Sequence, residues 1–331
     1  MGARQSSGIV PQLTSEVEAK GGSKISLNSE NLSDQDVLDL SLFLKQAPTV
    51  TELRLKNCFV NQTGATHLAT YLPETALSRL FLSCNIGMRD RGALPLIAAL
   101  PSSTLQELSL DTTNITDRTA RAIASVLPKC DLQTLYLGGN DISDVGASLL
   151  ADALPRSKVT KLYLSSSKIR DLGARSLGDA MKKHPLKALT LAANYISDVG
   201  AKFLAEGLAS CLTLQKLDLS CNDLTDDSVR FFLAAVERHP SITKVCVQYT
   251  ATSANIVQEL ELKLACLHSN KAKVLTMLCY CAMSEIPGRA KGNDESPIGL
   301  LPLELVRYLS SMLYDPTQTP SLRPAGRVNW Q

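Results

Sequence analysis

A short apolar phrase recurs nine times along the chain, at intervals of 27 or 28 residues, and it constrains the fold more than any other feature. In the clearest copies, two leucines bracket one residue and an asparagine follows, as in Leu135–Asn140, Leu189–Asn194 and Leu217–Asn222. The second apolar residue of each copy occupies positions 27, 55, 82, 110, 137, 164, 191, 219 and 247. This regularity predicts a solenoid, because each unit can bury its apolar face only by stacking on its neighbours.

Each unit reads as strand, turn, helix and turn, and residues 132–155 are typical. Tyr136 should point to the opposite side of a short strand from the two leucines beside it. Asn140 follows where the chain turns away, and its amide can bind exposed backbone groups of the turn. Ser143 is a suitable helix N-cap, and Asp144 suits the positive end of the helix dipole. Pro155 then ends the helix.

The pattern Leu-x-x-Leu-x-Leu-x-x-Asn-x-Leu, followed by a helix with a Gly-Ala entry, resembles the ribonuclease-inhibitor-like class of leucine-rich repeats. The resemblance covers residues 24–267. It implies an α/β fold, a horseshoe-shaped solenoid of about nine repeats with an inner parallel sheet, outer helices and degenerate end units that act as caps. One departure is an extra residue before Gly92, which predicts a local bulge.

The segments outside the repeats differ in composition from the array. Residues 1–23 are polar and are expected to be a disordered N-terminal segment. Residues 268–314 are expected to form a C-terminal helical extension that caps the array, and residues 315–331 a flexible tail. The domain organisation expected from the sequence is therefore one repeat array, residues 24–267, with short flanking segments.

Composition excludes several classes of function. The net charge is +2, from 34 basic and 32 acidic residues, which gives no reason to expect nucleic acid as a partner. Nine cysteines, an odd number and without a secretory signal, indicate free thiols in a reducing compartment, and we expect a cytoplasmic protein. Metal-ligand spacings, phosphate-binding loops and catalytic triads are not apparent. We therefore expect no cofactor, no metal, no catalytic residue and no enzymatic activity.

The residues between the paired leucines should form an exposed strip along the inner sheet. Tyr136 and Tyr163 should be neighbours there, because adjacent strands lie about 4.8 Å apart. Tyrosine and arginine dominate binding hot spots, so the strip predicts a protein-binding face. The alternative is a solvated strip whose aromatic rings shield the sheet. The candidate contact residues are Arg54, Phe81, Tyr136, Lys161, Tyr163 and Asp218.

The N-terminal residues Met1–Ser6 fit the pattern for N-myristoylation, with Gly2 as the acceptor. A chance match is the alternative. One acyl chain gives only marginal attachment, so any membrane contact through Gly2 should be weak and reversible.

Two C-terminal segments, 274–283 and 301–309, resemble the box of suppressors of cytokine signalling. The resemblance implies a substrate receptor of a cullin-type ubiquitin ligase, with elongin and cullin as partners. Val274 and Tyr280 depart from that pattern, and a simple helical cap is the preferred alternative. The implied adaptor contacts are Leu275 and Cys279 for elongin, and Leu301 and Pro302 for cullin.

Two further classes share this kind of repeat. The Ran GTPase-activating protein belongs to the same repeat class, but this chain lacks the long acidic tail typical of that family, and no catalytic position can be carried over. A microbial repeat effector is another alternative. The function that the sequence favours is non-enzymatic binding of a protein partner on the concave face.

Overall fold

The computed structural model describes residues 22–237, 239–248, 250–265 and 267. All but Leu267 belong to one unit, Met1–Ala265. In the described part of the chain, nine parallel strands form one sheet in sequence order. The strands are β1 (Lys24–Asn28), β2 (Glu52–Lys56), β3 (Arg79–Phe81), β4 (Glu107–Ser109), β5 (Thr134–Tyr136), β6 (Lys161–Tyr163), β7 (Ala188–Thr190), β8 (Lys216–Asp218) and β9 (Lys244–Cys246).

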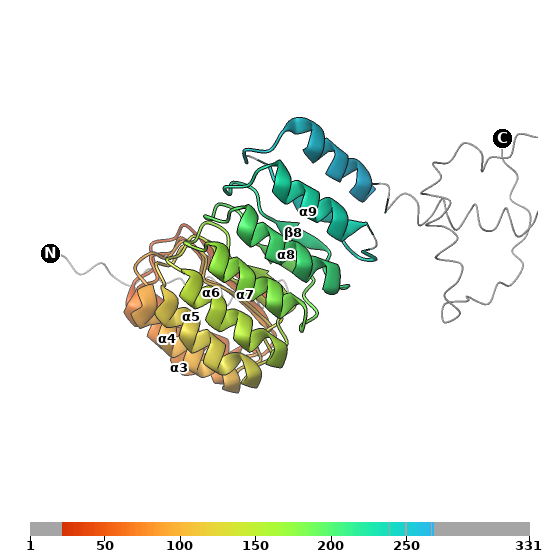
Figure 1. The fold of residues 1–331 in the computed structure, drawn as a ribbon. Coiled ribbons are helices and arrows are strands. Elements are labelled where there is room, and N and C mark those ends of the chain that lie inside the picture. The colour runs from red at the N-terminus through yellow and green to blue at the C-terminus, as the bar shows by residue number, and fades with distance from the viewer. Residues whose placement is uncertain (1–21, 238, 249, 266, 268–331) are drawn as a thin grey trace, which may run out of the picture. The chain divides into compact units, whose positions relative to one another are not determined.

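A helix follows each strand, and the helices lie side by side on one face of the sheet (Figure 1). They are α2 (Asp34–Gln46), α3 (Gln62–Tyr71), α4 (Arg89–Ala99), α5 (Asp117–Val126), α6 (Asp144–Ala153), α7 (Asp171–Met181), α8 (Asp198–Ser210), α9 (Asp226–Val236) and a helix over residues 254–265. Packed helices need about 8–10 Å each and strands only about 4.8 Å. The array therefore curves with the sheet on its concave side, and the predicted leucine-rich-repeat solenoid is confirmed.

The paired leucines form the core between sheet and helices. Leu135 is 1% exposed and Leu137 is fully buried, whereas Tyr136 between them is only half-buried on the other face of the sheet. Burying one leucine side chain contributes roughly 1.5–3 kcal/mol. Because the same pair recurs in every unit, the core runs without interruption along the array.

Asparagine side chains connect each unit to the one before it. Asn140 Oδ1 accepts hydrogen bonds from the backbone N–H groups of Thr113 (3.0 Å) and Ile115 (3.2 Å) in the preceding unit. Its Nδ2 donates to the carbonyl oxygens of Leu110 (2.8 Å) and Leu137 (2.9 Å), one from each unit. The predicted turn-binding role of Asn140 thus extends across the boundary between units. The side chains of Asn85, Asn194 and Asn222 also bond both their own and the preceding unit.

Aspartates at the helix starts make a second set of bonds between units. The Asp117 carboxylate accepts from the Ser143 backbone N–H (2.8 Å), the Ser143 hydroxyl and the Gly146 N–H (3.0 Å). A Cβ on Gly146 would lie 2.4 Å from Asp117 Oδ1, so a side chain here would displace that carboxylate oxygen. Asp144 and Asp171 bind the next unit in a similar way. The sequence predicts only a helix-dipole role for Asp144 and does not reveal this contact with the next unit.

The expected irregularities occur at the unit boundaries. The extra residue before Gly92 is accommodated where α4 begins, at Arg89, whose φ is 51°. Four helices continue into a short 3-10 turn with proline as its second residue: Leu72–Glu74, Leu100–Ser102, Leu127–Lys129 and Leu154–Arg156.

In one unit that lacks the asparagine, a buried polar group has no hydrogen-bond partner among the described residues. Ser167 stands where neighbouring units have Asn140 and Asn194, and it is 6% exposed. Among the described residues its Oγ is a buried side-chain atom without a hydrogen-bond partner. The Ile142 N–H, in the unit before Ser167, is equivalent to the Ile115 N–H that donates to Asn140. A longer amide side chain would reach these groups.

Replacing Ser167 with asparagine should therefore stabilise the array. We expect Ser167→Asn to raise the free energy of unfolding by about 1 kcal/mol, because it adds hydrogen bonds to buried backbone groups. The matched reverse change, Asn194→Ser, should lower it by about 1–3 kcal/mol. Urea unfolding followed by circular dichroism measures both. A Ser167→Asn protein no more stable than the wild type would contradict this explanation.

Candidate functional site

Three aromatic rings form a row on the concave face of the sheet. Tyr136 on β5 and Tyr163 on β6 are paired in register, and their rings stack with centroids 4.4 Å apart and an interplanar angle of 11°. Phe81 on β3 lies 6.3 Å from Tyr136. The intervening strand β4 contributes Ser109, which is 1% exposed and small enough to lie beneath this contact. The row is thus a continuous half-buried apolar surface that the core does not use.

Tyr136 is held in place by a carboxylate as well as by its neighbour. Its hydroxyl donates to Glu107 Oε1 at 2.9 Å. Burial, the hydrogen bond to Glu107 and the negative charge of Glu107 raise the pKa of Tyr136 well above its usual range. The phenol therefore stays protonated at neutral pH and remains a hydrogen-bond donor.

Arg54 extends the row at its N-terminal end, where its guanidinium already has a carboxylate partner. Its guanidinium lies 4.2 Å from the centroid of the Phe81 ring. It also pairs with Glu52, whose side chain is 4% exposed and which binds Arg79 (2.9 Å) and Lys24 (3.1 Å) too. Burial alone would raise the pKa of Glu52, but these cations outweigh it and lower the pKa. Arg54 therefore serves as a stacking element more than as the free charge that the sequence suggested.

The other two candidate residues lie toward the C-terminal end of the same face. Lys161, the first residue of β6, is exposed and makes no ion pair within the described residues. Asp218 on β8 lies two strands from Tyr163, and its Oδ2 is 3.5 Å from Lys216 Nζ. The structure thus brings Arg54, Phe81, Tyr136 and Tyr163 together and leaves Asp218 apart from them.

Asp111 is a partly buried carboxylate at the edge of the aromatic row. It accepts hydrogen bonds from the Gly138 N–H (2.7 Å) and the Ser109 hydroxyl (3.1 Å). Burial raises the pKa of Asp111, and these two hydrogen bonds offset only part of that effect. When Asp111 is ionised, its burial therefore lowers the free energy of unfolding.

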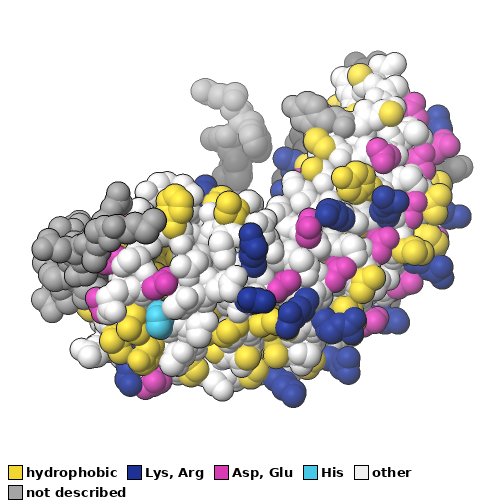
Figure 2. All heavy atoms as spheres, turned by 90° about the vertical axis from the view of Figure 1, so that its left-hand side faces the viewer, with side chains coloured by type: hydrophobic (Ala, Val, Ile, Leu, Met, Phe, Trp, Pro, Cys, Tyr) yellow, Lys and Arg dark blue, Asp and Glu magenta, His cyan; other side chains and the backbone are white. Residues whose placement is uncertain are grey.

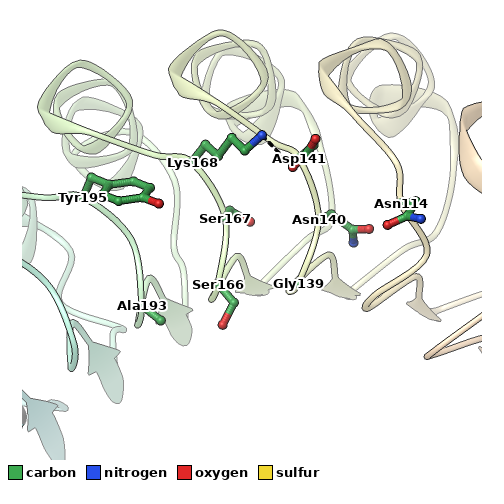
Figure 3. A pocket seen from close by; sticks show the side chains of 9 residues that line it. All are labelled: Asn114, Gly139, Asn140, Asp141, Ser166, Ser167, Lys168, Ala193 and Tyr195. Atoms are coloured by element: carbon green, nitrogen blue, oxygen red, sulfur yellow. Dashed lines mark ion pairs between the residues drawn. The ribbon is translucent and has the colours of Figure 1, made fainter. Parts of the chain in front are cut away.

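Apart from the aromatic row, a hollow lies at the loop edge of the sheet, where the chain leaves the strands (Figure 3). It is a shallow recess of about 350 Å³ that includes Ser167, Tyr195 and an ion pair between Lys168 and Asp141 of 2.9 Å. Because its two charged groups neutralise each other, the recess offers no unmatched charge to a ligand. Figure 2 shows one side of the array, on which apolar, basic and acidic side chains are interspersed. The concave aromatic row is therefore the stronger candidate site.

The described part of the chain holds neither a metal-binding cluster nor a membrane-spanning helix. No group of three or more His, Cys, Asp or Glu side chains in this part of the chain could hold a metal ion. None of its helices is long and apolar enough to cross a membrane. Several predicted sites lie outside the described residues: Gly2, Leu275, Cys279, Leu301 and Pro302.

The chain contains leucine-rich repeats. A family model described as "Leucine Rich repeat" matches residues 129–151 and 210–233, which fall within the repeat array. No curated protein matches the chain.

Solved structures that show weak similarity to the chain include the following three. The chain is 18% identical to one in the Rad7 and Elc1 complex in yeast, with a TM-score of 0.47 and coverage of 78% of this chain and 71% of that one. Internalin C2 from Listeria monocytogenes is 21% identical, with a TM-score of 0.39 and coverage of 64% and 73%. The actin-binding site 2 of leiomodin-1 is 17% identical, with a TM-score of 0.39 and coverage of 58% and 96%.

Asp111 generates a pH-dependent prediction. A carboxyl whose pKa is raised by folding binds protons more tightly in the folded state, so its contribution to stability falls as pH rises through the interval between its unfolded and folded pKa. We expect the stability of Asp111→Asn, relative to the wild type, to increase as the pH rises above about 4, the ordinary pKa of the carboxyl. Urea unfolding at a series of pH values measures it, with Asp152→Asn at an exposed position of α6 as the control variant. A relative stability of Asp111→Asn that decreases with pH would contradict the burial of this charge.

Proposed function

We propose that the concave face binds another protein and that this chain acts by recognition, without catalysing a reaction. The observation that supports the proposal is the row of stacked side chains from Arg54 through Phe81 and Tyr136 to Tyr163. Four large planar groups in contact on one open face are not required for folding, because the leucine core lies on the other side of the sheet. Aromatic residues and arginine are also the types that contribute most to protein interfaces.

The mechanism is docking onto a preformed surface. Tyr136 is fixed by Glu107 and Tyr163, and Arg54 by Glu52 and Phe81, before any partner arrives. Side chains that are already ordered lose little entropy on association, so more of the contact energy appears as affinity. The cross-unit hydrogen bonds hold the strands that carry these groups, so we expect little backbone movement on binding.

The test compares two kinds of tyrosine. Changing both Tyr136 and Tyr163 to aspartate places charge in the centre of the row and should abolish partner binding. The control, Tyr195→Asp, alters a tyrosine that is 54% exposed at the loop edge and should retain binding. Partners captured by the full-length protein are identified by mass spectrometry and then measured as purified proteins by calorimetry. Thermal unfolding checks that each variant is folded, and Tyr163→Ala serves as a milder change if the double variant is not.

The expected loss of affinity for the double variant is at least about 100-fold, since removing a hot-spot residue costs about 2 kcal/mol or more. Full binding by a folded double variant would exclude the aromatic row as the interface. If Tyr195→Asp lost binding and the double variant did not, the interface would lie at the loop edge instead.

A further inference from the structure

The two halves of the concave face differ in how their charges are used. On β1 to β4 the inward carboxylates are occupied: Glu52 binds three cations and Glu107 accepts the Tyr136 hydroxyl. On β6, β8 and β9 the first residue of each strand is a lysine: Lys161, Lys216 and Lys244. The inward carboxylates of the N-terminal half thus already have partners, whereas Lys161 and Lys244 of the C-terminal half have no ion pair among the described residues.

These three lysines face few carboxylates. Asp218 pairs with Lys216 at 3.5 Å, whereas Lys161 and Lys244 are exposed and have no ion pair within the described residues. Glu261 lies beyond the last strand, where Gln248 Nε2 donates to it at 3.5 Å. The positive charges of Lys161 and Lys244, at the two ends of this row of three lysines, therefore remain uncompensated.

The strand between Lys161 and Lys216 carries small side chains on the concave face. On β7 these are Ala188 and Thr190, which are 7% and 5% exposed. Thr190 is paired in register with the half-buried Tyr163, whose ring stacks by one face on Tyr136. An apolar side chain that packs on Tyr163 from the side of β7 would remove apolar surface from water.

The spacing defines what would fit. Lys161 and Lys244 are three strand intervals apart, about 14 Å, and an extended peptide advances about 3.3 Å per residue with successive side chains on opposite faces. Carboxylates four residues apart point to the same face and would reach both lysines, and a large apolar residue midway between them would face the sheet near β7. We propose that the C-terminal half of the concave face binds an acidic segment of another protein in extended form, with one apolar residue seated over β7. This inference rests on the proposed function and adds the chemistry of the partner.

A peptide suits this strip better than a nucleic acid. A phosphate backbone needs several cations along its path and none of its charges can be omitted. Here the carboxylates of Asp111 and Asp218 lie on the same face, and the net charge of the chain is only +2. A peptide can place carboxylates at Lys161 and Lys244 and neutral residues opposite the aspartates.

The test is selection from a phage-displayed library of random peptides, with the full-length protein as bait. The wild type should enrich sequences with Asp or Glu on both sides of a large apolar residue. The variant Lys161→Glu/Lys244→Glu should lose that preference and enrich Lys and Arg instead, because opposite charges are now required. The control Lys183→Glu/Lys202→Glu makes the same change in net charge at exposed lysines on and after the helices, and should keep the acidic preference.

Affinities of one enriched peptide give the quantitative outcome. Fluorescence polarisation should show at least about tenfold weaker binding to Lys161→Glu/Lys244→Glu and weaker wild-type binding as salt increases. No acidic enrichment, or an unchanged preference in the charge-reversed variant, would overturn the inference. Tighter binding of a labelled oligothymidine than of any peptide at about 150 mM salt would also overturn it, in favour of nucleic acid.

Failure of this inference is distinguishable from failure of the proposed function. If the partner is lost with the double tyrosine variant but the library shows no acidic preference, the concave interface stands and the acidic segment is wrong. If the partner is retained by the folded double tyrosine variant, the concave interface itself is wrong.

Discussion

Hydrogen bonds that cross from one repeat to the next are the constraint on which the rest of this structure depends. A unit of 27 or 28 residues is too small to bury its own leucines, so it must be held against its neighbours in one register. The amide of Asn140 and the carboxylate of Asp117 supply that register on either side of the turn, by binding backbone groups of the adjoining unit. Burial of the leucines provides the free energy of folding. The directional hydrogen bonds select the stacking that exposes the leucines least to water.

The concave face inherits its geometry from this stacking. Because the strands are in register, side chains at equivalent positions of successive repeats stand beside one another, as Tyr136 and Tyr163 do. Lateral contacts then fix the side chains themselves, through Glu107 for Tyr136 and through Glu52 for Arg54. The same geometry gathers cations of the N-terminal half around Glu52 and leaves Lys161 and Lys244 of the C-terminal half without an ion pair among the described residues. One face can thereby offer an apolar platform and a charged strip side by side.

Much of this could be predicted from the sequence, because it depends on periodicity. The leucine spacing is sufficient to predict the solenoid, the inward direction of Tyr136 and its position next to Tyr163. The pairing of Arg54 with Glu52 could not be predicted so directly, because Glu52 also forms ion pairs with Lys24 and Arg79 on the two flanking strands. The contact of Asp117 with the next unit was missed for the same reason, since it joins groups 26 and 29 residues apart. The serine that interrupts the asparagine series was a visible signal of the unsatisfied group at Ser167.

The central claim is that a partner docks on the concave aromatic row, and site-specific photo-crosslinking tests it most directly. A photo-reactive phenylalanine analogue replaces Phe81 in one protein and Tyr195, on the loop edge, in another. Each is irradiated with the purified partner and the adducts are mapped by mass spectrometry. The structure leads us to expect a specific adduct from position 81 and none from position 195. An adduct from position 195 without one from position 81 would contradict concave-face recognition.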